Sequence, residues 1–173
     1  MRIRPTLRAA GTALACIILP TAAFAVSQDV NLSADVAAEC TLNGSDNPAA
    51  IAQAISVSGG QPSITPITIT VPVSCNTRTE TYLSTTNAGL RGPTQIDGLS
   101  NRINYIANVT APGLASWTID TETAEPGVVS GGLVSTSAPH DNMTITITPK
   151  KNSIPLRNGT YNDTLRITLT IPQ

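Results

Sequence analysis

Alternation of apolar and polar residues, broken at short intervals by turn-forming residues, is the feature that most constrains this chain. Six runs carry this alternation, over residues 64–75, 79–86, 101–111, 114–120, 143–150 and 160–173. Side chains at every second position of a strand share one face, so each run predicts a strand with one buried face. Gly, Pro and Asn-Gly clusters separate the runs. Strands at this spacing, divided by turn signals, are typical of an all-β sandwich.

Two features modify this all-β prediction. Residues 47–57 ("NPAAIAQAISV") are rich in Ala, the best helix former, and are the best candidate for a short helix. Pro66 and Pro72 both fall in the run 64–75. Because proline cannot donate a backbone hydrogen bond, they predict that this strand lies at a sheet edge or contains bulges.

The N-terminal 25 residues have the features of an export signal. Arginines at positions 2, 4 and 8 precede an apolar stretch that ends in Ala23-Phe24-Ala25, a small-x-small cleavage site. A lipoprotein signal is the alternative, because Cys16 lies in this stretch, but the apolar sequence continues past it to Ala25. We therefore expect a signal peptide over residues 1–25 and an exported chain that begins at residue 26.

Cys40 and Cys75 are the two cysteines that remain after this cleavage. An exported protein meets an oxidising compartment, and an even number of cysteines favours one intradomain disulfide. It would close a loop of about 35 residues and stabilise the fold by about 3–4 kcal/mol. Two cysteines and the distant His140 lack the spacing of a metal site, so we expect none.

Residues suited to catalysis are sparse. The only histidine, His140, lies in the loop-like stretch "SAPHDN", where we expect a solvated side chain and not a member of a Ser-His-Asp triad. Glu122 and Glu125 in "TETAEPG" are expected in an exposed turn and not as a glycosidase pair. Phosphate-binding and dinucleotide-binding glycine motifs are absent from the sequence. We expect no enzyme activity and no cofactor.

The charge pattern also excludes one class of partner. The formal net charge is −1, and removal of the signal arginines makes the exported chain more acidic. No basic run is longer than Lys150-Lys151. Because nucleic-acid binding needs a basic patch, we expect no nucleic-acid partner.

Several segments together have the order of a known family. An alternating segment, residues 26–38, leads into Cys40, and a later strand ends at Cys75 in "VPVSCN". "LSTTNAGLRG" and "NRINYIANV" follow, and the chain closes on "NGTYNDTLRITLTIP", whose Gly-x-Tyr-x-Asp-x-Leu-x-Ile-x-Leu spacing is the most specific part. The chain thus resembles the spore coat protein U domain family, which includes archaic chaperone–usher pilin subunits. It departs from the family after Cys40, where "LNGSDNPAAIAQAISV" replaces a shorter element.

The resemblance implies an incomplete immunoglobulin-like sandwich that lacks its last strand. Residues 39–173 would form this pilin-like domain, and residues 26–38 would be a donor-strand extension that completes a neighbouring subunit. The implied donor side chains are Val30, Leu32, Ala34 and Val36. The implied wall of the chain's own acceptor groove consists of Leu165, Ile167, Leu169 and Ile171.

The same resemblance implies partners and a location. A periplasmic chaperone would fill the groove first, and an outer-membrane usher would carry the growing fibre out of the cell. Neighbouring subunits would then form a head-to-tail surface pilus that supports adhesion or biofilm. The alternative is a secreted monomeric sandwich that binds a glycan or surface ligand. In that case the N-terminal segment would be the first strand of its own sheet.

Overall fold

The computed structural model describes residues 28, 31–111, 113 and 116–172. The predicted signal peptide therefore lies outside the described residues. The chain divides into two units, residues 1–35 and residues 36–173. The described residues of the first unit are exposed and belong to no strand. All strands of the described residues belong to the second unit.

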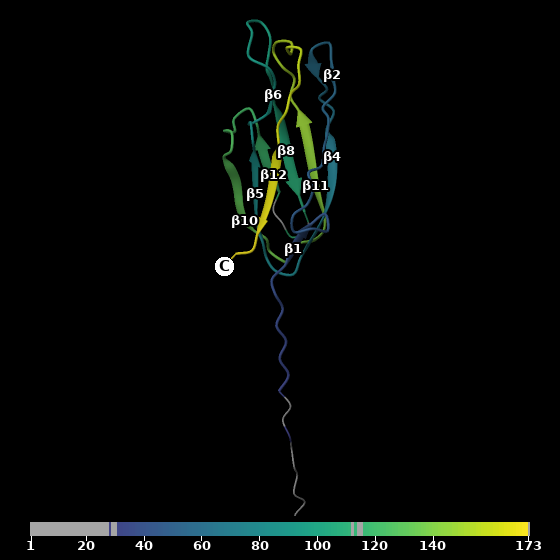
Figure 1. Cartoon of the computed structure of the whole chain (residues 1–173), viewed down its shortest axis with the longest axis vertical. Coiled ribbons are helices and arrows are strands. Elements are labelled where there is room, and N and C mark those ends of the chain that lie inside the picture. Colours follow the sequence, from purple (N-terminus) through teal and green to yellow (C-terminus); the bar gives the residue numbers. More distant parts are fainter. Residues whose placement is uncertain (1–27, 29–30, 112, 114–115, 173) are drawn as a thin grey trace, which may run out of the picture. The chain divides into compact units, whose positions relative to one another are not determined.

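The second unit is built from strands and loops, and its described residues contain no helix (Figure 1). The strands are β1 (Cys40–Leu42), β2 (Val57–Ser58), β3 (Gln61–Pro62), β4 (Ile67–Cys75), β5 (Glu80–Thr85), β6 (Leu90–Arg91), β7 (Arg102–Ile103), β8 (Tyr105–Thr110), β9 (Trp117–Asp120), β10 (Val129–Val134), β11 (His140–Pro149) and β12 (Leu165–Thr170). The all-β fold class is thus confirmed. Accordingly, no helix within the described part of the chain could span a membrane.

The Ala-rich stretch does not form the predicted helix. Residues 48–56 are neither helix nor strand, and Val57 begins β2. The prediction was wrong because local propensity is a weak signal. A helix this short is marginal unless it buries an apolar face, and residues 47–54 are all exposed.

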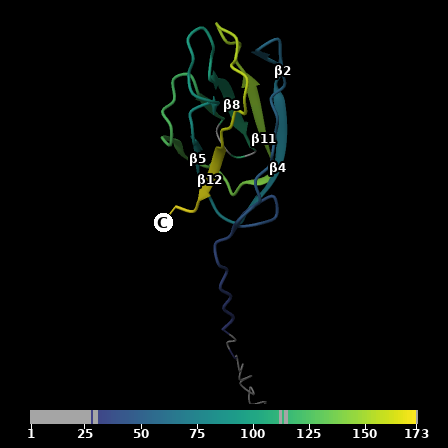
Figure 2. The same cartoon turned by 45° about the horizontal axis from the view of Figure 1, so that its top comes forward.

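Two antiparallel sheets form the body of the domain (Figure 2). One has the order β1-β4-β11-β8-β9 and the other has the order β10-β5-β12, while β2-β3 and β6-β7 are small separate ladders. One core cluster joins the sheets: Val109 and Met143 from the first sheet pack with Leu83 from the second, and all three are almost fully buried. Face-to-face packing over a shared core is the arrangement of a β-sandwich.

A disulfide joins β1 to β4, which confirms the predicted pair. Cys40 and Cys75 are directly opposite each other in the β1–β4 ladder. The next residue, Asn76, holds the chain just before β1. Its side-chain amide donates to the Ala37 carbonyl (2.7 Å), and its side-chain oxygen accepts from the Glu39 N–H (2.9 Å). The point where the chain enters the domain is therefore fixed to the end of β4.

The pairing of β1 with β4 stops after three residues. Asn43 and Gly44 both have positive φ (51° and 73°), and Leu42 and Ser45 exchange backbone hydrogen bonds of 2.9 and 3.0 Å. This is a two-residue hairpin turn of the kind that Asn-Gly favours. At the same point the Pro72 carbonyl accepts from the Asn43 N–H (2.7 Å), but Pro72 has no N–H to return. The edge of β4 beyond Pro72 is left without a partner strand on this side.

Candidate binding groove

A groove of about 950 Å³ opens between the two sheets. Its lining comes mainly from β12, β4, β11 and the segment between β1 and β2, with further residues from β1, β6 and β8. The aliphatic side chains from the first three strands are Leu165, Ile167 and Leu169 on β12, Ile67, Ile69 and Val71 on β4, and Ile145 and Ile147 on β11. The groove is therefore long and mainly apolar, and strand residues form its walls.

One side of the groove is the open edge of β12. Among the described residues β12 pairs only with β5. The Thr86 N–H donates to the Thr164 carbonyl (3.0 Å), so the backbone groups of Thr164 face β5. In an antiparallel ladder this direction alternates along the strand. The backbone N–H and C=O groups of Leu165, Ile167 and Leu169 therefore face the open side.

The opposite side of the groove is the open edge of β4. The Pro72 carbonyl faces the β1 side, and by the same alternation the backbone groups of Thr68 and Thr70 face that side too. β1 pairs only with residues 73–75 of β4, so Thr68 and Thr70 lie beyond its end. The groove thus lies between two strands that each present unpaired backbone donors and acceptors, and this arrangement favours the binding of a further strand.

The side chains of β12 are only half covered. Leu165, Ile167 and Leu169 are half-buried and pack against the core, whereas Arg166 and Thr168 are exposed on the other face. In a complete sandwich the inward positions of a strand next to the core are usually buried. Aliphatic surface on β12 therefore remains available to a ligand that enters the groove.

The predicted wall residues are largely brought together. Leu165, Ile167 and Leu169 line the groove. Ile171 follows the end of β12, is half-buried and is not among the residues that line the groove.

The predicted donor residues belong to no strand, as far as they are described. Val30 is outside the described residues. Leu32, Ala34 and Val36 are exposed and belong to no strand, and the exposed fractions are 91% for Leu32 and 79% for Val36. Apolar side chains this exposed can gain burial on binding to a partner.

One end of the groove is polar and firmly held. Asp163, just before β12, accepts hydrogen bonds from the Asn87 N–H (2.8 Å), the Gly89 N–H (3.0 Å) and the Tyr105 hydroxyl (2.8 Å). Burial, together with the charge of Asp163 and the hydrogen bond to it, raises the pKa of the Tyr105 phenol well above its ordinary value. Tyr105 therefore stays a neutral donor, and Asp163 fixes the start of β12.

Sequence reasoning missed several residues of this site. Asp163 and Tyr105 belonged to the quoted motifs, but nothing in the motifs showed that they contact each other. The β4 wall could have been found, because Ile67, Ile69 and Val71 alternate as clearly as the β12 residues do. That residues 47–55 would lie along the groove had no signal in the sequence.

The residues weighed for catalysis lie elsewhere. His140 is exposed at the start of β11, where its Nδ1 hydrogen-bonds with the Ala138 carbonyl (2.9 Å). Glu122 contacts Lys150 (2.6 Å), and Lys150 also contacts Asp120 (2.7 Å). No group of acidic, histidine or cysteine side chains that could hold a metal ion occurs within the described ranges. That the protein is not an enzyme stays a prediction.

Residues of this chain alone form the groove and its two open strand edges. Comparison of the chain with models of protein families, with curated proteins and with solved structures found no match in any of the three.

Proposed function

We propose that the protein is a structural subunit of a surface fibre that assembles by donor-strand exchange. The observation that carries this proposal is the apolar groove between two unpaired strand edges, on β12 and β4. The domain is then an immunoglobulin-like sandwich without its last strand. A chaperone covers the groove before assembly, an usher exports the fibre, and a neighbouring subunit supplies the missing strand.

The N-terminal segment has the pattern that such a groove requires. Val30, Leu32, Ala34 and Val36 alternate with polar residues over most of their length, so one face of an extended segment is apolar. Burial of each larger aliphatic side chain contributes roughly 1.5–3 kcal/mol. The polar groups of the donor backbone pair with the open edges of β12 and β4. A strand of this kind therefore supplies hydrogen-bond partners to both edges and covers the apolar walls at the same time.

The direction of the donor strand follows from where the chain enters the domain. β1 lies at the same end of the domain as the C-terminal end of β12 (Figure 1). A donor antiparallel to β12 would run toward the opposite end and connect there to its own domain. Each subunit then receives a strand at one end and extends its own from the other. Such head-to-tail contacts do not close on themselves, so they build a linear fibre.

Removal of the donor segment should separate polymerisation from strand binding. We expect a chain without the signal and residues 26–37, expressed without a chaperone, to form no fibres. It should still bind a synthetic peptide of residues 26–38, because its groove is unchanged. Electron microscopy and fluorescence anisotropy of the labelled peptide measure the two properties. A full-length exported chain that remains a stable monomer, with residues 26–38 paired in its own sheet, would contradict the proposal and support a secreted monomeric binding protein.

Ala34→Trp tests the placement of the donor side chains. Ala34 is the smallest of the four and is assigned to a shallow position in the groove, so an indole there should clash with the wall. We expect the substitution to block polymerisation while export of the protein continues. Fibre yield and the amount of exported protein are measured together. Unchanged polymerisation would show that Ala34 does not enter the groove.

A further inference from the structure

The segment between β1 and β2 lies along the groove without being part of either sheet. Residues 47–53 and Ile55 line the groove together with β12 and β4. No hydrogen bond among the described residues involves residues 48–55. Residues 47–54 are exposed, and only Ile55 is half-buried. We call residues 47–55 the strap.

The strap is weakly attached because of how it leaves β1. The Asn43-Gly44 turn directs the chain away from β4, and Pro72 offers no N–H to a continued ladder. The open edges of β4 and β12 therefore keep their unpaired backbone groups even though the strap is next to them. The apolar residues of the strap, chiefly its alanines with Ile51 and Ile55, line the groove beside the aliphatic side chains of β12 and β4.

The strap has part of the pattern of the donor segment, but with a polar residue in the middle. Ile51, Gln53 and Ile55 alternate, as Leu32, Ala34 and Val36 do. A strand seated with this alternate set inward would bury the Gln53 amide in an apolar groove, which is costly without hydrogen-bond partners. A donor with apolar residues at successive alternate positions has no such penalty. The strap can therefore cover the groove but cannot match a donor strand.

We propose that the strap is a built-in cover of the acceptor groove, which shields the aliphatic walls in the unassembled subunit and moves aside when a donor strand enters. This inference rests on the proposed function, because it concerns the regulation of the same groove. Displacement breaks no backbone hydrogen bond of residues 48–55, and residues 47–54 of the strap itself are already exposed. The strap thus limits how fast a donor strand enters, while the final complex is held by the donor.

Two sets of substitutions should change the rate of entry in opposite directions. Ile51→Ser with Ile55→Ser weakens the apolar contact of the strap, so we expect donor association to be about three- to tenfold faster. Gln53→Val removes the polar interruption and strengthens the strap, so we expect association to slow by a similar factor. The control is Ile96→Ser. Ile96 has the same exposed fraction as Ile51, 46%, but does not line the groove.

The measurement uses the full exported chain at a concentration too low for self-assembly, mixed with excess labelled peptide of residues 26–38. Association is followed by stopped-flow anisotropy. Faster entry for the serine variant, slower entry for Gln53→Val and no change for Ile96→Ser support the cover. Equal rates in all variants, or slower entry in the serine variant as expected if the strap were a fixed wall, overturn it. If the wild-type chain does not bind the peptide at all, the proposed function itself fails.

Discussion

Replacement of Ile167 by aspartate is expected to abolish donor-strand binding, with an affinity for the peptide of residues 26–38 that falls at least about 100-fold. Ile167 is the middle one of the three aliphatic β12 residues that line the groove, and it is half-buried. A donor strand would cover it completely and take the new carboxylate out of water. No cationic side chain in the donor segment could pair with that charge.

Thr168→Asp is the matched control for this effect. Thr168 is the next residue of β12 and is exposed. It also borders the groove, but strand alternation places its side chain on the opposite face from Ile167. The substitution therefore introduces the same charge on the same strand, with the carboxylate on the other face. Peptide titration by anisotropy measures both variants, and circular dichroism checks that each is folded. Equal losses in the two variants, or an unchanged affinity for Ile167→Asp, would contradict the assignment of β12 as the groove wall.

The second large effect concerns Asp163, whose replacement by alanine should lower the free energy of unfolding by about 2–4 kcal/mol. The carboxylate accepts from the backbone of Asn87 and Gly89 and from the Tyr105 hydroxyl. Alanine leaves these donors without an acceptor, and Tyr105 is almost fully buried, with an exposed fraction of 3%. An unsatisfied buried donor costs more than the net value of the bond that held it.

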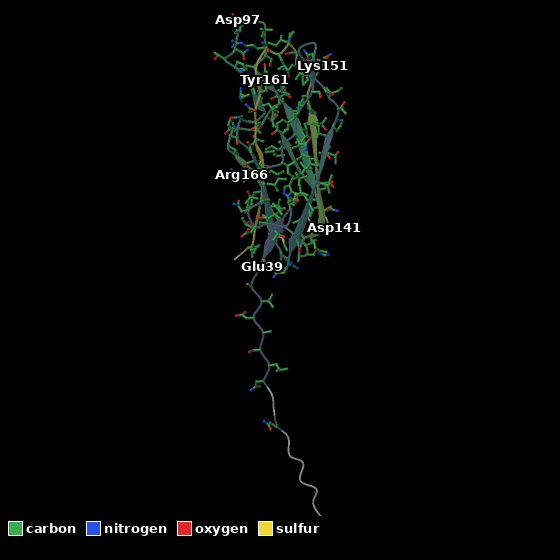
Figure 3. All side chains as sticks on the ribbon, turned by 45° about the vertical axis from the view of Figure 1, so that its right-hand side comes forward. Glu39, Asp97, Asp141, Lys151, Tyr161 and Arg166 are labelled. Atoms are coloured by element: carbon green, nitrogen blue, oxygen red, sulfur yellow. A yellow bond between two sulfur atoms is a disulfide. The ribbon has the colours of Figure 1, made fainter. Side chains whose placement is uncertain are left out.

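Urea unfolding, followed by circular dichroism with the disulfide intact, measures this loss. Asp97→Ala is the control, because Asp97 is an exposed loop residue at the surface of the domain (Figure 3). Its free energy of unfolding should equal that of the wild type. A loss for Asp163→Ala no larger than for Asp97→Ala would show that the carboxylate does not hold the start of β12.

The sequence predicted much of the sheet structure, because most strands here have one buried and one exposed face. The predicted run 64–75 contains β4, and the run 160–173 contains β12. β10 was missed, since its "VSGGLV" sequence has two consecutive glycines that favour a turn. In the structure these glycines, Gly131 and Gly132, both have positive φ and lie in a register shift of the β10–β5 ladder. Glycine alone does not distinguish a bulge from a turn.

The groove was predictable only in part for a related reason. Alternation identifies which residues of a strand share its inward face, and it placed Leu165, Ile167 and Leu169 together on one face of the predicted strand. Which strands end up unpaired is a property of the whole topology. It depends here on the early turn at Asn43-Gly44 and on Pro72, for which the sequence predicted either an edge position or a bulge. The strap and the contact of Asp163 with Tyr105 depend on long-range packing, which no local pattern records.

In the proposed fibre, the position of the disulfide would have a mechanical consequence under tension. Force on the N-terminal segment reaches the domain at Cys40, which is bonded directly to Cys75 at the end of β4. The covalent link passes the load from Cys40 to Cys75, the last residue of β4, and on along the backbone to Asn76. The backbone of residues 41–74 is bypassed by the disulfide and does not carry the force. The strap and the Asn43-Gly44 turn therefore carry no tension while the subunit is pulled. We expect stretching of the fibre not to detach the strap or β1 from the domain.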